Sequence, residues 1–154
     1  MKNLKQKLII EQMDTKLKEF IPLLKNQSPE SGWLNAIRTS LKMSFRQFGN
    51  RMNLTPQGAE GIEKREKDGS ITLRSLEEAG RALNMKLVYG FVPMDGSIEK
   101  TIEKRARDIA LEIVKTTSNT MALEDQENTS KRLKKAVEDK AKQLVYEMPR
   151  HLWD

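Results

Sequence analysis

Three polar side chains, Gln57, Glu60 and Lys64, follow the dipeptide Thr55-Pro56 at spacings of three and four residues. Residues at these spacings lie on one face of an α-helix. An amide donates and accepts hydrogen bonds, a carboxylate accepts them, and an ammonium group donates them. Such a face predicts recognition of a polar partner through hydrogen bonds and charge.

The reactive side chains of the sequence argue against an enzyme. There is no cysteine, and the single histidine, His151, lies three residues from the end. These counts exclude a disulfide scaffold, a thiolate zinc site, a cysteine nucleophile and a multi-histidine metal site, and we expect no cofactor. Glu124 and Asp125 are adjacent carboxylates, but neighbours on a helix point about 100° apart and make a poor acid–base pair.

The charge of the chain favours an anionic partner such as nucleic acid. The sequence has 28 Lys and Arg against 22 Asp and Glu, a formal net charge of +6. The excess is not gathered in a tail, so a basic protein without such a partner stays an alternative. No apolar run approaches the roughly 18 residues of a membrane span. We expect a cytoplasmic protein that does not contact a membrane.

The apolar pattern predicts a mainly α-helical protein organised in four segments. Apolar residues recur every three or four positions in the first and last segments, which is typical of amphipathic helices. Sharp turns separate several short helices in the second segment, and the third has the alternation of a strand. The predicted segments are an N-terminal helix (1–29), a compact helical domain (30–84), a strand and turn (85–97) and a C-terminal helical region (98–154).

The strand predicted over 86–92 needs a partner, because the backbone groups of a lone strand are unpaired. Either a second strand of the same chain or another copy of the chain pairs with it. We expect Leu87, Tyr89 and Phe91 at a contact between two copies or with another protein. Trp153 is a large apolar residue one position from the end, and it packs either there or against its own domain.

Local signals predict where two short helices of the second segment begin and end. Ser44 and Gln47 have the spacing of a capping box, which starts a helix. Thr55 before Pro56 combines a capping residue with proline at the first helical position. Gly69 predicts the end of this second helix.

The turn between these two helices meets the steric requirements of a helix-turn-helix. Gly49 leaves room where the helices cross, and Asn53 tolerates the left-handed conformation of the turn. Leu54 is expected to fill the core behind the turn. Ala59 and Ile62 face inward from the second helix, which leaves the polar face described above outside.

The string SFRQFGNRMNLTPQGAEGIE over Ser44–Glu63 resembles the Cro/CI-type helix-turn-helix family (XRE) of phage repressors and antitoxins. The resemblance covers residues 30–84 and implies a lambda-repressor-like, DNA-binding domain. Two departures from the family pattern are Asn53, where glycine is usual, and the pair Gly58 and Gly61. Each of these glycines costs about 1 kcal/mol relative to alanine inside a helix.

The resemblance implies roles for single residues. Gln57 occupies the position of the family's base-reading glutamine, whose amide can bond to adenine through two hydrogen bonds. Glu60 would also face bases, and Gly61 either lets the backbone approach DNA or allows tight packing. Glu63 would pair within the fold. The residues expected at phosphates are Ser44, Arg46, Arg51, Thr55 and Lys64, although any of them could be an ordinary cap or surface charge.

A narrower resemblance extends over most of the chain. Four stretches are similar to the family called mobile mystery protein A: Ile71–Leu76, Leu87–Pro93, Met121–Gln126 and Leu152–Asp154. That resemblance implies a Fic-domain partner protein in a toxin–antitoxin-like arrangement. We also expect a homodimer that represses its own operon, because a single helix-turn-helix buries too little surface for tight specific binding and two are usually paired across a palindromic DNA site. The alternative is a protein-interaction module that masks its partner, with DNA binding minor.

Antitoxins of Fic proteins generally insert a helix with the pattern [S/T]-x-x-x-E-[G/N]. This chain has two partial matches, Thr15…Glu19-Phe20 and Thr120…Glu124-Asp125. Both lack the final small residue. We therefore expect any neutralisation of the partner to work through repression, or through the C-terminal helices and the Leu152–Trp153 end.

Overall fold

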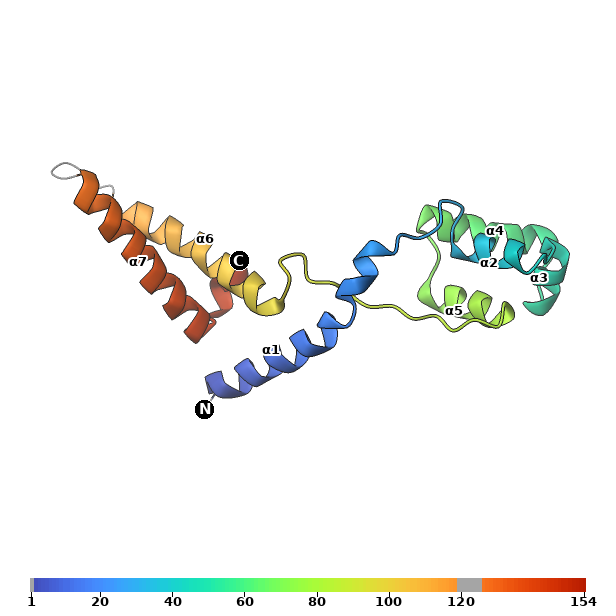
Figure 1. The fold of residues 1–154 in the computed structure, drawn as a ribbon, viewed down its shortest axis with the longest axis horizontal. Helices are drawn as coiled ribbons and strands as arrows, with labels where there is room; N and C mark the ends of the chain where they lie inside the picture. The colour runs from blue at the N-terminus through green and yellow to red at the C-terminus, as the bar shows by residue number, and fades with distance from the viewer. Residues whose placement is uncertain (1, 119–125) are drawn as a thin grey trace. The chain divides into compact units, whose positions relative to one another are not determined.

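The computed structural model describes residues 2–118 and 126–154, and it confirms a mainly helical protein (Figure 1). No helix within these residues is long and apolar enough to cross a membrane. The elements in chain order are α1 (Lys2–Lys18), the 3-10 helix η1 (Ile21–Lys25), α2 (Trp33–Ser40), α3 (Phe45–Arg51), α4 (Pro56–Asp68), α5 (Leu73–Ala82), α6 (Ile98–Ser118), α7 (Gln126–Glu147) and the 3-10 helix η2 (Arg150–Trp153).

The chain divides into two compact units. The central unit is Leu23–Gly90, and the terminal unit combines Met1–Pro22 with Phe91–Asp154. The first helix therefore belongs with the last two, and the central unit is inserted between them in the sequence.

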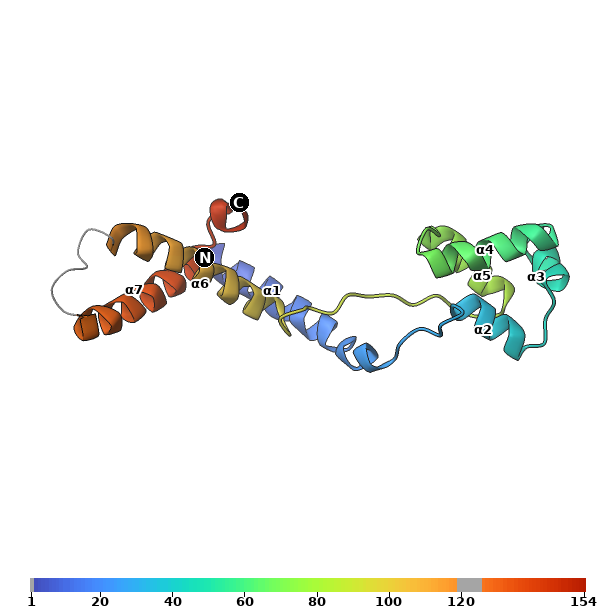
Figure 2. The same cartoon turned by 90° about the horizontal axis from the view of Figure 1, so that it is seen from above.

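The central unit contains α2–α5 (Figure 2). These helices surround one apolar core. α4 contacts α2, α3 and α5, so it is the helix against which the others pack. The buried members of the core are Leu34, Phe48, Ala59, Ile62, Ala79 and Leu83.

The predicted helix boundaries of this unit are confirmed. Ser44 and Gln47 form a reciprocal capping box at the start of α3. The Thr55 hydroxyl accepts a hydrogen bond from the Gly58 N–H at 3.0 Å, and Pro56 is the first residue of α4. Gly69 ends α4 with a φ of 77°, a conformation that favours glycine.

The turn between α3 and α4 is as tight as the sequence predicts. Asn53 has a φ of 56°. A Cβ on Gly49 would lie 2.7 Å from the Leu54 carbonyl oxygen and 2.9 Å from that of Thr55, so only glycine fits. The expected core position of Leu54 is wrong, because its side chain is 38% exposed. The core behind the turn is filled by Phe48, which is fully buried.

A buried ion pair ties α2 to α4. Arg38 donates hydrogen bonds from its guanidinium to the Glu63 carboxylate and from Nη1 to the Met43 carbonyl at 2.7 Å. Asn35 also donates to Glu63, at 2.9 Å, and the guanidinium lies 3.9 Å from the centre of the Phe45 ring. The expectation that Glu63 pairs within the fold is confirmed.

The residues that α2 buries are not the ones that its apolar pattern predicts. Trp33, Ile37 and Leu41 share a helical spacing, yet Trp33 and Leu41 are about half exposed. Leu34 and Arg38 are the buried residues. Ile37 is partly buried against the core, and the Arg38–Glu63 ion pair lies on the same inward side of α2.

The predicted strand is not formed. Residues 86–92 have no assigned secondary structure and make no backbone hydrogen bonds within the described chain. Val88, Tyr89 and Phe91 are 68%, 64% and 79% exposed. The physical reason is that the described residues contain no second strand, so the backbone of this segment is left to solvent.

The terminal unit has α6 and α7 packed along one another, with α1 and η2 against α6. Its buried core is Ile102, Ala106, Ile109, Ala110, Leu144 and Leu152. The end of the chain is held by Arg105, which donates to the Leu152 carbonyl at 2.7 Å and to the Asp154 carbonyl at 2.5 Å.

The first helix is shorter and less regularly amphipathic than predicted. α1 ends at Lys18 because Pro22 lacks an N–H, and its ring would meet the carbonyl four residues earlier. Ile10 and Leu17 are partly buried, whereas Leu4 and Leu8 are 64% and 49% exposed. The apolar residues of α1 therefore occupy two different faces.

Carboxylates fix the start of α6. Asp14 on α1 accepts hydrogen bonds from the backbone N–H groups of Ile98 at 2.6 Å and Glu99 at 3.2 Å. Asp95 accepts from Lys104 at 3.0 Å and from Thr101 at 3.1 Å. The hydrogen bond from Lys104, followed by that from Thr101, lowers the pKa of Asp95 below its ordinary 3.8, and Asp95 in turn raises the pKa of Lys104.

Candidate nucleic-acid interface

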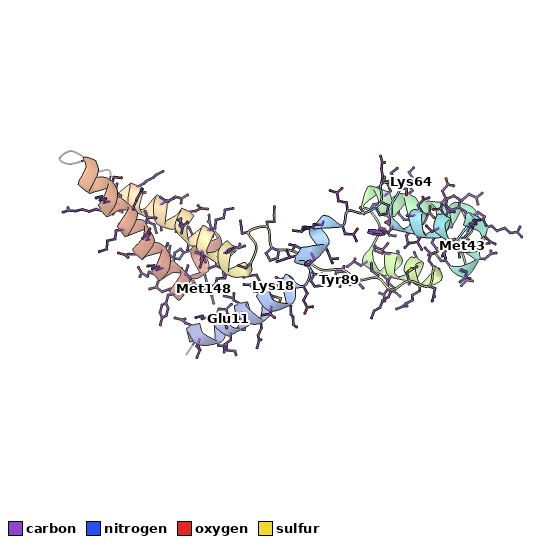
Figure 3. The ribbon with its side chains drawn as sticks, in the orientation of Figure 1. Glu11, Lys18, Met43, Lys64, Tyr89 and Met148 are labelled. Carbon is purple, nitrogen blue, oxygen red and sulfur yellow. The ribbon has the colours of Figure 1, made fainter. Side chains whose placement is uncertain are left out.

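The outer face of α4 collects the polar side chains singled out from the sequence. Gln57, Glu60 and Lys64 are exposed along this face, and Figure 3 marks Lys64. The opposite face is buried, with Ala59 at 0% and Ile62 at 6% exposure. This helix thus presents an amide, a carboxylate and an ammonium group while its other side forms the core.

The two glycines of α4 have different surroundings. A Cβ on Gly58 would lie 3.3 Å from both the Leu54 Cβ and the Thr55 Oγ1, so this glycine fits against the turn. A Cβ on Gly61 would meet only the flexible end of Arg65, at 3.3 Å. Packing between helices thus gives no reason for Gly61, and the missing side chain leaves the α4 backbone open to an approaching molecule.

The charges on α4 are sorted by face. Glu63 is paired with Arg38, and Glu66 accepts hydrogen bonds from the N–H groups of Trp33 at 3.1 Å and Leu34 at 2.7 Å at the start of α2. Two acids of α4 are therefore occupied inside the unit. The exposed basic residues of the same helix, Lys64, Arg65 and Lys67, have no salt bridge within the described residues.

The residues expected at phosphates lie in three settings. Ser44 and Thr55 are exposed, and their oxygens accept the capping hydrogen bonds, which leaves each O–H group as a donor for another molecule. Arg46 is exposed on α3. Arg51 is exposed too, but it donates to the Ala82 carbonyl at 3.4 Å and is held towards the end of α5.

The residues expected at a dimer or partner contact are only partly brought together. Phe91 and Trp153 line a common groove of about 350 Å³ in the terminal unit, and Trp153 stays 57% exposed. Leu87 is partly buried, and Tyr89, marked in Figure 3, is exposed; neither lines this groove. Leu152, beside Trp153, is the residue that packs into the core, with 0% exposure.

Only the first of the two partial matches to the Fic-inhibitor pattern lies within the described residues. Thr15 donates to the Glu11 carbonyl within α1, whereas Glu19 lies beyond the end of that helix. The second match, Thr120…Glu124-Asp125, lies outside the described residues, as does most of Met121–Gln126.

The described residues contain no group of three or more His, Asp or Glu side chains that could hold a metal ion. Comparisons with family models, curated proteins and solved structures find no match to this chain.

Proposed function

We propose that the central unit is a helix-turn-helix DNA-binding domain and that the protein is a sequence-specific transcriptional regulator. One observation carries the proposal: α4 buries Ala59 and Ile62 and exposes Gln57, Glu60 and Lys64 on its outer face. An α-helix fits the major groove of DNA, where residues near its N-terminal end meet base edges.

Each exposed group has a distinct role in this proposal. The Gln57 amide bonds to adenine N6 and N7, and the Glu60 carboxylate accepts from a cytosine amino group. Gly61 lets the helix backbone come close to the bases. Lys64 and Arg46 contact phosphates, with the Ser44 and Thr55 hydroxyls as further donors; such contacts position a protein without selecting a sequence.

The resemblance to antitoxin families suggests which gene the regulator controls and which protein it works with. We propose an autorepressor that acts as a homodimer on a palindromic site and controls a Fic-domain partner. Since Glu19 lies beyond α1, neutralisation through a glutamate on that helix is disfavoured.

A second candidate is a protein-interaction module that masks its partner. It is favoured by the many large apolar side chains that stay exposed in the terminal unit, among them Phe91, Met94 and Trp153. In this reading DNA binding is minor. Co-expression with the partner, from a promoter that this protein cannot control, separates masking from repression.

The test of DNA binding is a mobility-shift titration with DNA from upstream of the protein's own gene and with random DNA. Gln57→Ala should cost about 1–3 kcal/mol on the operator and little on random DNA, because a base contact carries discrimination. Lys64→Ala should weaken both nearly equally, because phosphate contacts do not depend on sequence. Equal losses on the two DNAs for Gln57→Ala would remove the base-reading assignment.

A further inference from the structure

The terminal unit contains a groove of about 1110 Å³ between α1, α6 and α7. Its lining residues recur every three or four positions on each helix: Asn3, Lys7 and Ile10 on α1; Glu99, Glu103 and Arg107 on α6; Glu138, Ala141 and Val145 on α7. The groove therefore follows the helix axes for two turns or more. It is larger than the roughly 300–1,000 Å³ of small-molecule pockets, and an elongated groove between helices suits a further helix.

The chemistry of the groove defines what kind of helix fits it. The apolar floor of the groove includes Ile10, Ile102, Val145 and Met148. Figure 3 labels two of the lining residues, Met148 and Glu11. Acids outnumber bases among the lining residues: Glu11, Glu99, Glu103, Glu138 and Glu147 against Lys7, Arg107 and Lys142. None of these acids has a salt bridge within the described residues. A complementary helix has an apolar stripe and an excess of basic residues.

α1 itself has these properties on the side that its own unit leaves uncovered. The first seven residues of the chain contain three lysines and no acid. Leu4 and Leu8 lie on the same side of α1, one turn apart, and are 64% and 49% exposed. The inner side, with Ile10 and Leu17, already contacts the unit. One side of α1 therefore forms a wall of the groove, and its other side has the properties of a helix that would fit into such a groove.

We propose that the groove is filled by α1 of a second copy, so that two terminal units associate around a two-fold axis. Leu4 and Lys7 line the groove of their own copy. In a two-fold symmetric contact the same surface of both copies takes part, so these residues lie where the two copies meet. The Leu4–Leu8 surface then covers the apolar floor, and the lysines of α1 face the partner's acidic rim. This inference assigns a surface to the proposed homodimer and does not depend on DNA binding.

The first experiment measures association of the full chain by sedimentation equilibrium in the absence of DNA. We expect a mass of twice 17.7 kDa. Leu4→Asp should raise the dissociation constant by at least about tenfold, since it places a charge in an apolar contact. Leu24→Asp is the matched control, because Leu24 is 65% exposed but lies in the central unit; it should leave the dimer unchanged. Circular dichroism checks that both variants stay helical.

The second experiment exchanges charges between copies. Lys7→Glu and Glu103→Lys should each weaken association, because like charges meet in both symmetric contacts. An equimolar mixture of the two variants should restore a species of dimer mass, since a mixed pair has opposite charges in both contacts. Compensation within one chain cannot produce that result, because each chain in the mixture carries only one change.

A monomeric parent protein, a dimer insensitive to Leu4→Asp, or a mixture that does not reassociate would each overturn the proposal. A dimer lost through Phe91→Asp but not through Leu4→Asp would overturn it in favour of pairing through the 86–92 segment. Because no DNA is present, these outcomes are independent of the mobility-shift result.

Discussion

The central and terminal units are built differently around their apolar cores. In the central unit four short helices enclose a core that includes the fully buried Phe48 and a paired Arg38–Glu63. In the terminal unit three long helices leave a groove of about 1110 Å³ and side chains such as Leu4 and Trp153 more than half exposed. Both units leave large apolar side chains exposed, such as Leu41 and Val88 in the central unit, and the terminal unit adds a groove between its helices.

The largest expected effect concerns the buried Arg38–Glu63 ion pair of the central unit. Arg38→Ala should lower its free energy of unfolding by about 3–5 kcal/mol, because it leaves the Glu63 carboxylate buried without its partner. Fluorescence can follow each unit separately, since Trp33 and Trp153 are the two tryptophans and lie in different units. Urea unfolding in a Trp153→Phe background therefore reports on the central unit.

Arg81→Ala is the control for that measurement. Arg81 pairs with Glu77 at 2.6 Å, but its side chain is 71% exposed, so its loss should cost no more than about 0.5 kcal/mol. Equal effects of the two arginine variants would contradict the view that the buried pair holds α2 on α4.

The second prediction concerns the core of the terminal unit. Leu152→Ala should destabilise that unit by about 2–4 kcal/mol, because it removes a fully buried side chain near the end of the chain. Trp153 fluorescence in a Trp33→Phe background follows the change. The central unit should unfold as before, and a loss there of similar size would show that the two units do not unfold independently.

The sequence and the structure agree best where the signal is local. The Ser44–Gln47 box, the Thr55 cap and the left-handed Asn53 involve neighbours within three residues, so their spacing alone identifies them. The partner of Arg38 lies 25 residues away, and nothing in the α2 sequence predicts that a charge rather than Trp33 faces the core.

The predicted strand and the predicted apolar stripe of α1 are wrong because the local pattern does not contain the packing partner. An alternating apolar segment is a strand only if another strand pairs with it, and residues 86–92 have no such partner in the described chain. The sequence predicts one apolar stripe on α1, but Ile10 follows Leu8 by two residues, which turns about 200° around the helix. As a result Leu4 and Leu8 are far from the face of Ile10 and Leu17.

The third prediction separates stability from recognition within α4. Gly61→Ala should stabilise the central unit by about 0.5–1 kcal/mol, since alanine is a better helix former and meets only the mobile end of Arg65. The same change should weaken operator binding if the backbone approaches DNA there. Gly49→Ala is the contrast, because its Cβ would meet two carbonyl oxygens and should destabilise the unit. Unchanged operator affinity for Gly61→Ala would argue against a close approach at this residue.

The smallest expected effect concerns pH and the start of α6. Lys104 and Thr101 lower the pKa of Asp95, so its contribution to stability is present above the pKa of the unfolded chain and is lost as the pH falls through the lower folded value. Asp95→Asn should therefore be slightly less stable than the parent at pH 7, and the difference should vanish only in acid below the folded pKa of Asp95, which itself lies below the ordinary 3.8. Urea unfolding followed at Trp153 at both pH values checks this, and a difference that persists in acid would contradict it.

The discontinuous origin of the terminal unit has a consequence for biosynthesis. During translation α1 leaves the ribosome first, but α6 emerges only after the whole of Leu23–Gly90 has been made. The inserted unit has all of its contacts available by then and can fold on the nascent chain, because domains generally fold as units during synthesis. α1 must wait without its packing surface until the last helices are released. Until α6 has left the exit tunnel of the ribosome, the nascent chain therefore carries a folded central unit and an unpaired first helix.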